Sequence, residues 1–197
     1  MALTKTPICD FGKKAEKFEL NSTDNKKISL NDVKGENGTL IMFICNHCPY
    51  VKAVIEDIVE DCKKLEANGI KSVAICSNDV KNYPEDSFDN MIKFSTNHNF
   101  GFPYLFDETQ EIAKKFGAVC TPDFFGYNKN LELQYRGRIR ELKELKPTSG
   151  GDSDLYKAMK QIAETDNGPK DQIPSCLLYT SDAADEGLGV DLGGRRI

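Results

Sequence analysis

Apolar and polar positions change their spacing several times along the chain, and each change marks an expected element. Residues 15–34 alternate apolar and polar side chains on either side of the polar turn STDNKK. The apolar positions of this segment are Phe18, Leu20, Ile28 and Leu30. Such a period of two predicts a small N-terminal β-hairpin. The run TLIMFI at residues 39–44 is almost wholly apolar, which indicates a strand buried on both faces of a sheet.

The segment after this strand has the spacing of a helix. From Val51 to Leu65 the apolar side chains recur at positions i, i+3, i+4 and i+7, and Asn68 and Gly69 give a stop signal. The apolar run IKSVAIC at residues 70–76 then predicts a second buried strand. A strand, a helix and a strand in this order predict a βαβ unit with parallel strands and a right-handed crossover.

The second half of the chain continues to alternate between helical and extended patterns. The expected elements are a helix over roughly 85–97, a strand in FPYLF (102–106), a helix in DETQEIAKKFG (107–117), a hairpin in TPDFFGYNKNLELQYRG (121–137) and an amphipathic helix in SDLYKAMKQIAE (153–164). The hairpin is expected to turn at Asn128–Asn130. Together these elements predict an α/β protein.

Composition and charge narrow the class of protein. The chain has 197 residues, of which 39% are hydrophobic, and a formal net charge of −5 without a basic run. One globular domain with a hydrophobic core is expected, and neither nucleic acid nor membrane is an expected partner. No segment approaches the roughly 18 apolar residues of a membrane helix, and the N-terminus lacks the apolar stretch of a secretory signal. We therefore expect a cytoplasmic protein.

Three regions are expected along the chain: a leader at residues 1–14, a domain at 15–165 and a disordered tail at 166–197. The last part of the tail, CLLYTSDAADEGLGVDLGGRRI at 176–197, has no periodicity. It resembles the in-frame translation of a transposase-type sequencing adapter. We therefore interpret residues 176–197 as read-through that is not native to the protein.

Two cysteines lie three residues apart in FICNHCPYVKAV, residues 43–54. In a cytosolic protein a C-x-x-C pair near a strand–helix–strand pattern predicts redox chemistry. Pro49 favours the first position of a helix, which makes Cys48 the N-cap. There the positive end of the helix dipole lowers a thiol pKa below its usual value of about 8.5. We expect Cys48 to attack and Cys45 to resolve; the reverse order, or two buried fillers, stays open.

Several motifs carry a resemblance to a known family. FICNHCPYVK, YPEDS, FPYLFDETQEIAKKFGAVCTPDFF and YRGR resemble the AhpC/TSA–redoxin branch of the thioredoxin superfamily, over about residues 10–165. The resemblance implies a thioredoxin-like α/β fold, with a central mixed sheet, helices on both faces and an N-terminal β-hairpin. It places Cys48 at the thioredoxin nucleophile and Val51 at the usual resolving position. Peroxiredoxins carry a threonine where this chain has Cys45.

The same resemblance assigns a substrate loop to AVCTPDFF, residues 118–125. Pro122 matches the family's cis-proline, whose loop faces the active thiol, and the backbone of Thr121 would pair with an extended substrate. An ordinary turn proline is the alternative. Cys120 lies two residues before Pro122, where it is either a third redox thiol or a small core residue.

His47 separates the two cysteines. Protonated, it would favour their thiolates; neutral, it could bind a metal, and a solvent-facing loop histidine is the third possibility. Structural zinc requires four ligands, and only His98 and scattered cysteines remain to complete a set. HCPYV also resembles the start of a Sco-type copper site, but Lys52 stands where the second cysteine of such a site would be. We therefore expect no bound metal and no bound cofactor.

Two groups of residues outside the C-x-x-C motif also carry candidate chemistry. Arg136, Arg138 and Arg140 alternate in YRGRIRE and either hold an anionic substrate or are solvated. Among the other cysteines, Cys62 and Cys76 are expected in the core, and Cys9 in a mobile leader.

These features predict a thiol–disulfide oxidoreductase that uses the Cys45/Cys48 dithiol. Its expected substrates are protein or small-molecule disulfides, with Pro49, His47, Thr121 and Pro122 around the bound substrate, and an external thiol would reduce the enzyme again. The alternative is an antioxidant thiol peroxidase in which peroxide oxidises Cys48. A second alternative, from another class, is a copper-binding or redox-sensing module.

Overall fold

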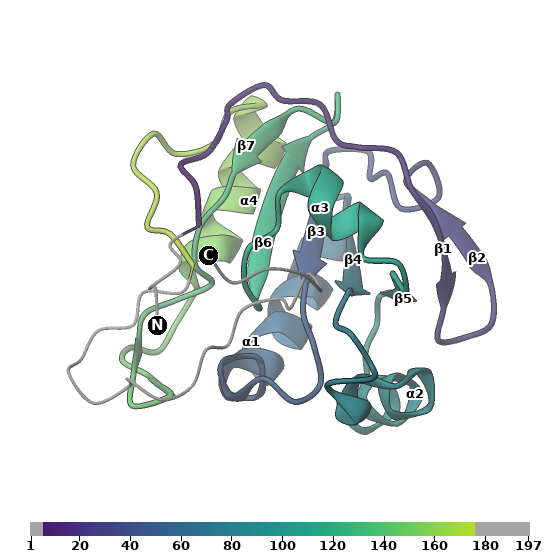
Figure 1. Cartoon of the computed structure of the whole chain (residues 1–197). Helices are drawn as coiled ribbons and strands as arrows, with labels where there is room; N and C mark the ends of the chain where they lie inside the picture. The colour runs from purple at the N-terminus through teal and green to yellow at the C-terminus, as the bar shows by residue number, and fades with distance from the viewer. Residues whose placement is uncertain (1–5, 176–197) are drawn as a thin grey trace.

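A computed structural model describes residues 6–175, so the adapter-like segment at 176–197 lies outside the described residues. Its centre is a mixed seven-stranded sheet in the order β2-β1-β5-β4-β3-β6-β7 (Figure 1). The strands of this sheet are β1 (Glu19–Ser22), β2 (Lys27–Ser29), β3 (Gly38–Phe43), β4 (Ile70–Cys76), β5 (Tyr104–Phe106), β6 (Asp123–Asn128) and β7 (Leu133–Tyr135). A separate small hairpin consists of β8 (Leu142–Lys143) and β9 (Lys146–Pro147).

The central strand β3 determines the topology of the sheet. All six of its residues are buried, as the apolar run at 39–44 predicted. It pairs in parallel with β4 and antiparallel with β6, so the expected βαβ unit and the expected hairpin after residue 121 meet on its two sides. The N-terminal hairpin of β1 and β2 is also present and joins the sheet through β5.

Helices cover both faces of the sheet, as predicted. The helices are α1 (Pro49–Glu66), α2 (Phe88–Asn97), α3 (Glu111–Phe116) and α4 (Asp154–Thr165), with a 3₁₀ turn η1 (Pro84–Asp86) before α2. Side chains of α1, α2 and α4 share one apolar core with one face of the sheet. Side chains of α3 and of the N-terminal hairpin share a second core on the opposite face. The chain therefore has two cores, with β3 contributing alternate residues to each.

One predicted helix is shorter than its pattern suggests. The segment 107–117 is helical only at α3, because Asp107 lies outside the helix and its carboxylate accepts a hydrogen bond from the Ala113 N–H at 2.9 Å. The residue before α3, Gln110, has a left-handed backbone with a φ of 61°. Gly117 ends the helix in the left-handed conformation that glycine adopts without steric cost.

The leader and the start of the tail both pack on the domain. The leader pairs with the outer side of β7: the Gly12 N–H donates to Leu133 O at 2.9 Å and the Leu133 N–H donates to Lys13 O at 2.8 Å. Cys9, expected in a mobile leader, is buried. After α4, the Gln172 side chain donates to Gln134 O at 2.9 Å. The described residues on both sides of 15–165 thus belong to the packed domain.

Within residues 6–175, every helix is too short or too polar to span a lipid bilayer.

Candidate redox site

Cys48 occupies the N-cap position of α1, and Pro49 is the first helical residue. The first helical hydrogen bond runs from the Lys52 N–H to Cys48 O at 3.0 Å. The Cys48 side chain lies inside the protein, with only 1% of the residue exposed. In its thiol form, its Sγ atom donates to the backbone oxygen of Thr121 at 3.2 Å. The sulfur is therefore buried at a helix start and against a polar backbone group.

Cys45 lies in the loop between β3 and α1, three residues before Cys48, and is equally buried. Its Sγ atom makes a hydrogen bond with the Thr121 hydroxyl oxygen at 3.3 Å. Both sulfurs of the C-x-x-C pair thus contact the same residue, one through its backbone and the other through its side chain. Sequence reasoning assigned only a backbone role to Thr121; the hydroxyl contact is a finding of the structure.

The two thiols titrate very differently. The hydrogen bond from Cys45 lowers the pKa of Cys48 from 9.0 to about 6, although burial opposes this shift. The Thr121 side chain and the first-turn N–H groups of Val51 and Tyr50 lower it further. The same thiol–thiolate hydrogen bond raises the pKa of Cys45 far above its ordinary range, as do burial and the charge of Asp86. At neutral pH the pair therefore holds one proton, which stays on Cys45.

The loop opposite these sulfurs is the one that the sequence suggested. The Thr121–Pro122 peptide bond is cis, as the resemblance implied. Cys120, the candidate third thiol, is buried, and its sulfur lies 3.7 Å from Pro122 O. It is packed in the same loop, next to the residues that contact the dithiol. Its redox role stays a prediction.

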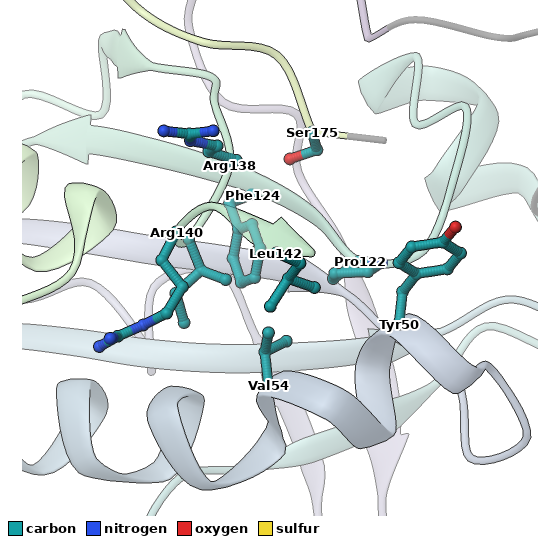
Figure 2. Close-up of a pocket in the computed structure, with 9 residues that line it drawn as sticks. Tyr50, Val54, Pro122, Phe124, Arg138, Arg140, Leu142 and Ser175 are labelled. Carbon is teal, nitrogen blue, oxygen red and sulfur yellow. The ribbon is translucent and has the colours of Figure 1, made fainter. Parts of the chain in front are cut away.

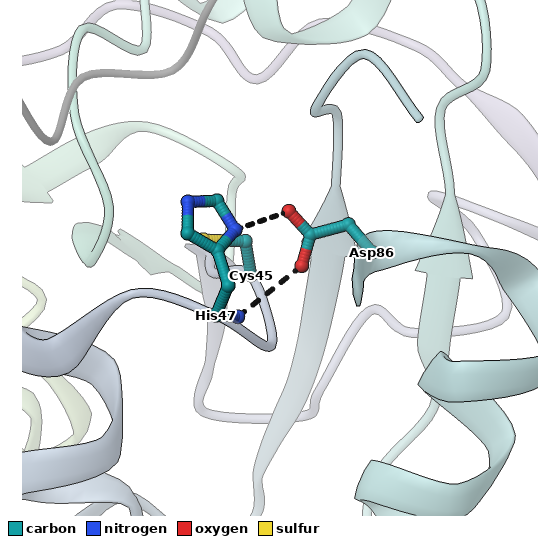
Figure 3. A group of neighbouring side chains, drawn as sticks. All are labelled: Cys45, His47 and Asp86. Atoms are coloured by element: carbon teal, nitrogen blue, oxygen red, sulfur yellow. Dashed lines mark hydrogen bonds and ion pairs between the residues drawn. The ribbon is translucent and has the colours of Figure 1, made fainter. Parts of the chain in front are cut away.

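His47 points to a carboxylate that sequence reasoning did not single out. Its Nδ1 atom lies 2.6 Å from Asp86 Oδ2, and its ring stacks on that of Tyr83 with a centroid separation of 4.7 Å (Figure 3). Asp86 is fully buried in η1 and also accepts hydrogen bonds from the backbone N–H groups of Asn46 and His47 at 2.7 and 3.3 Å. The motif YPEDS contains Asp86, but no local pattern shows that η1 folds over a loop 40 residues earlier.

Cys45, His47 and Asp86 could hold a metal ion only if their ligand atoms were not already engaged in hydrogen bonds. Cys45, His47 and Asp86 each offer a ligand atom, and these atoms lie within 4.8 Å of one another. Asp86 Oδ2, however, accepts hydrogen bonds from His47 Nδ1 and from Asn78 Nδ2, while Oδ1 accepts two from the backbone. A carboxylate oxygen has about two lone-pair sites, and here all of them are used. The Asp86 carboxylate is thus engaged in hydrogen bonds with His47, Asn78 and the backbone, and the three residues do not form an open ligand set.

A small apolar pocket lies beside the cis-proline (Figure 2). Its walls come from the start of α1, from the strand after Pro122 and from β8, and its apolar lining includes Tyr50, Val54, Phe124 and Leu142. Figure 2 shows the Tyr50 ring next to Pro122, and the Val54 and Leu142 side chains pointing toward each other. Because Tyr50 follows Cys48 by two residues, the pocket adjoins the dithiol.

The three arginines of YRGRIRE do not form one anion site. Arg136 is buried on the other side of the sheet, 3.0 Å from Asp123 and over the Phe125 ring. Arg138 and Arg140 reach the pocket, but each is paired, with Asp154 at 2.9 Å and with Asp57 at 3.0 Å. The expectation is therefore wrong for Arg136, which is buried against Asp123. For Arg138 and Arg140, which line the pocket, an anion-binding role stays a prediction.

Comparisons with known proteins agree with this arrangement. Residues 11–142 match the model of the AhpC/TSA family. A curated relative, the thiol-disulfide oxidoreductase ResA of Bacillus thuringiensis subsp. konkukian (strain 97-27), is 26% identical over 141 residues, which cover 71% of this chain and 73% of the relative. The chain belongs to the AhpC/TSA family.

Solved structures give the fold independently. An uncharacterized conserved protein from Geobacillus kaustophilus is similar with a TM-score of 0.81 and 38% identity, covering 88% of this chain and 93% of that one. The thioredoxin domain of a thiol-disulfide oxidoreductase from Bacteroides vulgatus is similar with a TM-score of 0.61 and 14% identity, covering 79% and 99%. The predicted thioredoxin-like fold is thus confirmed.

Proposed function

We propose that this protein is a thiol–disulfide oxidoreductase in which Cys48 attacks and Cys45 resolves. The observation that carries the proposal is the position of Cys48 at the N-cap of α1, where its pKa is lowered while that of Cys45 is raised. A nucleophile must be a thiolate near neutral pH, and a resolving thiol must stay protonated until the first step is complete. The curated relative named as a thiol-disulfide oxidoreductase supports the class of reaction.

The reaction proceeds in two exchanges. In the first, the Cys48 thiolate attacks one sulfur of a substrate disulfide, forms a mixed disulfide and releases the other substrate thiolate. In the second, Cys45 loses its proton and attacks Cys48 Sγ, which releases the second substrate thiolate and leaves a Cys45–Cys48 disulfide. The substrate gains two electrons, and the dithiol loses them. An external thiol then reduces the protein, and we propose the cytoplasm as the compartment that supplies it.

The loop beside Pro122 is the proposed substrate contact. Thr121 O lies 3.2 Å from the attacking sulfur, so a backbone that pairs with Thr121 would bring its own disulfide to Cys48. The adjoining pocket, lined by Val54, Phe124 and Leu142, would receive an apolar side chain of that substrate segment. His47 and Pro49 border the same thiols on the other side.

Trapping the mixed disulfide tests the roles of the two cysteines. Cys45→Ser should accumulate a covalent adduct with a disulfide substrate such as insulin, visible on a non-reducing gel and released by dithiothreitol. Cys48→Ser should form no adduct. If Cys48→Ser traps substrate and Cys45→Ser does not, the two roles are reversed.

A thiol peroxidase is the second candidate, because the family name and the Cys48–Pro49 pair both fit a peroxide-reactive cysteine. Peroxide would oxidise Cys48 to a sulfenic acid with release of water, and Cys45 would then condense with it to a disulfide. Stopped-flow measurement of thiol loss separates the candidates. A fast reaction with hydrogen peroxide and slow insulin reduction would favour the peroxidase over the oxidoreductase.

A further inference from the structure

We propose that the His47–Asp86 pair accepts the proton of Cys45 in the second exchange, and so completes the catalytic machinery of the proposed oxidoreductase. The inference rests on the proposed function, since it assigns a role within the same two-step reaction. It concerns the one step for which the Cys45/Cys48 pair itself holds no base, because the Cys48 sulfur is then already bonded to the substrate.

The geometry brings the three groups together. Cys45 Sγ, a ring nitrogen of His47 and a carboxylate oxygen of Asp86 lie within 4.8 Å of one another. Figure 3 shows the imidazole hydrogen-bonded to the carboxylate, with the Cys45 sulfur partly hidden behind the ring in this view. A separation of this size is closed by a side-chain rotation or by one bridging water, as is common before a substrate binds.

Asp86 determines which nitrogen can take a proton. Its buried carboxylate accepts from His47 Nδ1 at 2.6 Å, so Nδ1 carries the hydrogen and Nε2 has the free lone pair of the neutral ring. The other contacts of Asp86, with Asn78 and with the backbone of the C-x-x-C loop, prevent it from turning away. When Nε2 is protonated, the adjacent carboxylate stabilises the imidazolium. The His47 side chain is 21% exposed, so the proton can pass on to solvent.

The surroundings make such a base necessary. The titratable groups around the pair are the thiols Cys45, Cys48 and Cys76 and the phenols Tyr83 and Tyr104. Burial and the charge of Asp86 raise the pKa of Cys45, so its thiolate is scarce at neutral pH. A base beside Cys45 therefore acts in the second exchange, in which Cys45 must lose its proton.

The proposed step combines one proton transfer with one thiol–disulfide exchange. The Cys45 S–H bond breaks and its proton moves to His47 Nε2, while the sulfur forms a bond to Cys48 Sγ. The bond between Cys48 Sγ and the substrate sulfur breaks, and its electron pair leaves on the substrate thiolate. The imidazolium then gives its proton to that thiolate or to water.

The rates of the two exchanges can be measured separately with a disulfide reagent that releases one coloured thiolate in each exchange. Excess 5,5′-dithiobis(2-nitrobenzoate) reacts with Cys48 to release one thionitrobenzoate, and attack by Cys45 releases a second, both followed at 412 nm by stopped flow. We expect His47→Gln to leave the first rate within about twofold and to slow the second at least about tenfold at pH 7, since positioned bases contribute 10²–10⁴ in rate. The second rate of His47→Gln should keep rising with pH where the wild-type rate has levelled off.

The controls make each outcome decisive. All variants carry Cys176→Ser, because the described cysteines outside the pair are buried. In that background Cys45→Ser must show the first release alone, and His98→Gln, which changes the other histidine of the chain, must leave both phases unchanged. Asp86→Asn, checked for folding by circular dichroism, should slow the second phase as well. If the second rate and its pH profile are the same in His47→Gln as in the wild type, the inference is overturned while the oxidoreductase stands. If Cys48→Ser retains the first phase, the proposed function itself fails.

Discussion

Cys48 and Cys62 lie on the same helix, and both are buried, yet their thiols have opposite properties. Burial raises the pKa of Cys62 to about 12, and that of Cys76 at the end of β4 to about 12 as well. The pKa of Cys48 instead falls to about 6, because a second thiol, a threonine side chain and backbone N–H groups of the first helical turn surround it. Burial therefore does not decide the chemistry of a thiol; the polar groups that share its cavity do.

Replacing Cys48 and Cys62 separately by serine is the strongest test of this contrast. Cys48→Ser should lower insulin reduction at least about 10³-fold, since removing a nucleophile removes the reaction path. Cys62→Ser, the matched change on the same helix, should leave turnover within about twofold, because Cys62 lies in the apolar core and away from the dithiol. A comparable loss of activity in both variants would contradict the contrast.

The pH dependence of the Cys48 thiolate gives a second test of the contrast between Cys48 and Cys62. Absorbance at 240 nm should reveal one thiolate forming with a midpoint near pH 6, absent in Cys48→Ser. Because the folded-state pKa lies below the unfolded value, the stabilising contribution is fully present above about pH 9 and disappears as the pH falls through 6. The difference of three pH units corresponds to at most about 4 kcal/mol. This contribution is measured as the difference in the free energy of unfolding between the reduced wild type and Cys48→Ser at pH 5, 7 and 9. A difference that does not change with pH would refute the lowered pKa of Cys48.

The contribution of Thr121 is expected to be smaller. Thr121→Val keeps the shape of the side chain but removes the hydroxyl, which contacts Cys45 Sγ at 3.3 Å and lowers the pKa of Cys48. We expect a rise of roughly one unit in the Cys48 pKa, since one hydrogen bond to a charged group contributes about 1.5 kcal/mol or more. Thr121→Ser retains the hydroxyl and should titrate like the wild type. Equal pKa values in the Val and Ser variants would remove the hydroxyl from the explanation.

Cys120→Ser should have the smallest effect on activity of the variants considered. If its role is that of a packed core residue, Cys120→Ser will leave the disulfide species on a non-reducing gel and the insulin rate unchanged within about twofold. The change should cost only about 1 kcal/mol of stability, as is typical of single substitutions. Loss of an oxidised species in this variant would instead identify Cys120 as a third redox thiol.

The fold was predictable because its signals are local. The period of Val51 to Leu65, the apolar run of β3 and the Pro49 start signal each reflect a few neighbouring residues, and the structure follows them. The same is true of the N-cap position of Cys48. Where a predicted element differs, as in α3, a side chain from outside the helix, that of Asp107, satisfies the backbone of its first turn.

The rest of the site could not be predicted because it depends on contacts between distant segments. Asp86 meets the Cys45–Cys48 loop across 40 positions, and the Thr121 side chain meets Cys45 across 76. Nothing in YPEDS or AVCTPDFF encodes these pairings by spacing alone. The arginines illustrate the opposite error: Arg136 reads as a surface charge by residue type, but a buried partner, Asp123, keeps it inside.

The pairing of the leader with β7 has a consequence for self-association. A sheet edge with open N–H and C=O groups is a template on which another chain can assemble. Here Gly12 and Lys13 occupy the groups of Leu133 that face outward, so this rim of the sheet offers no register to a neighbouring copy. Removal of residues 1–15 would uncover these groups of β7 and would favour edge-to-edge association of two copies of the chain.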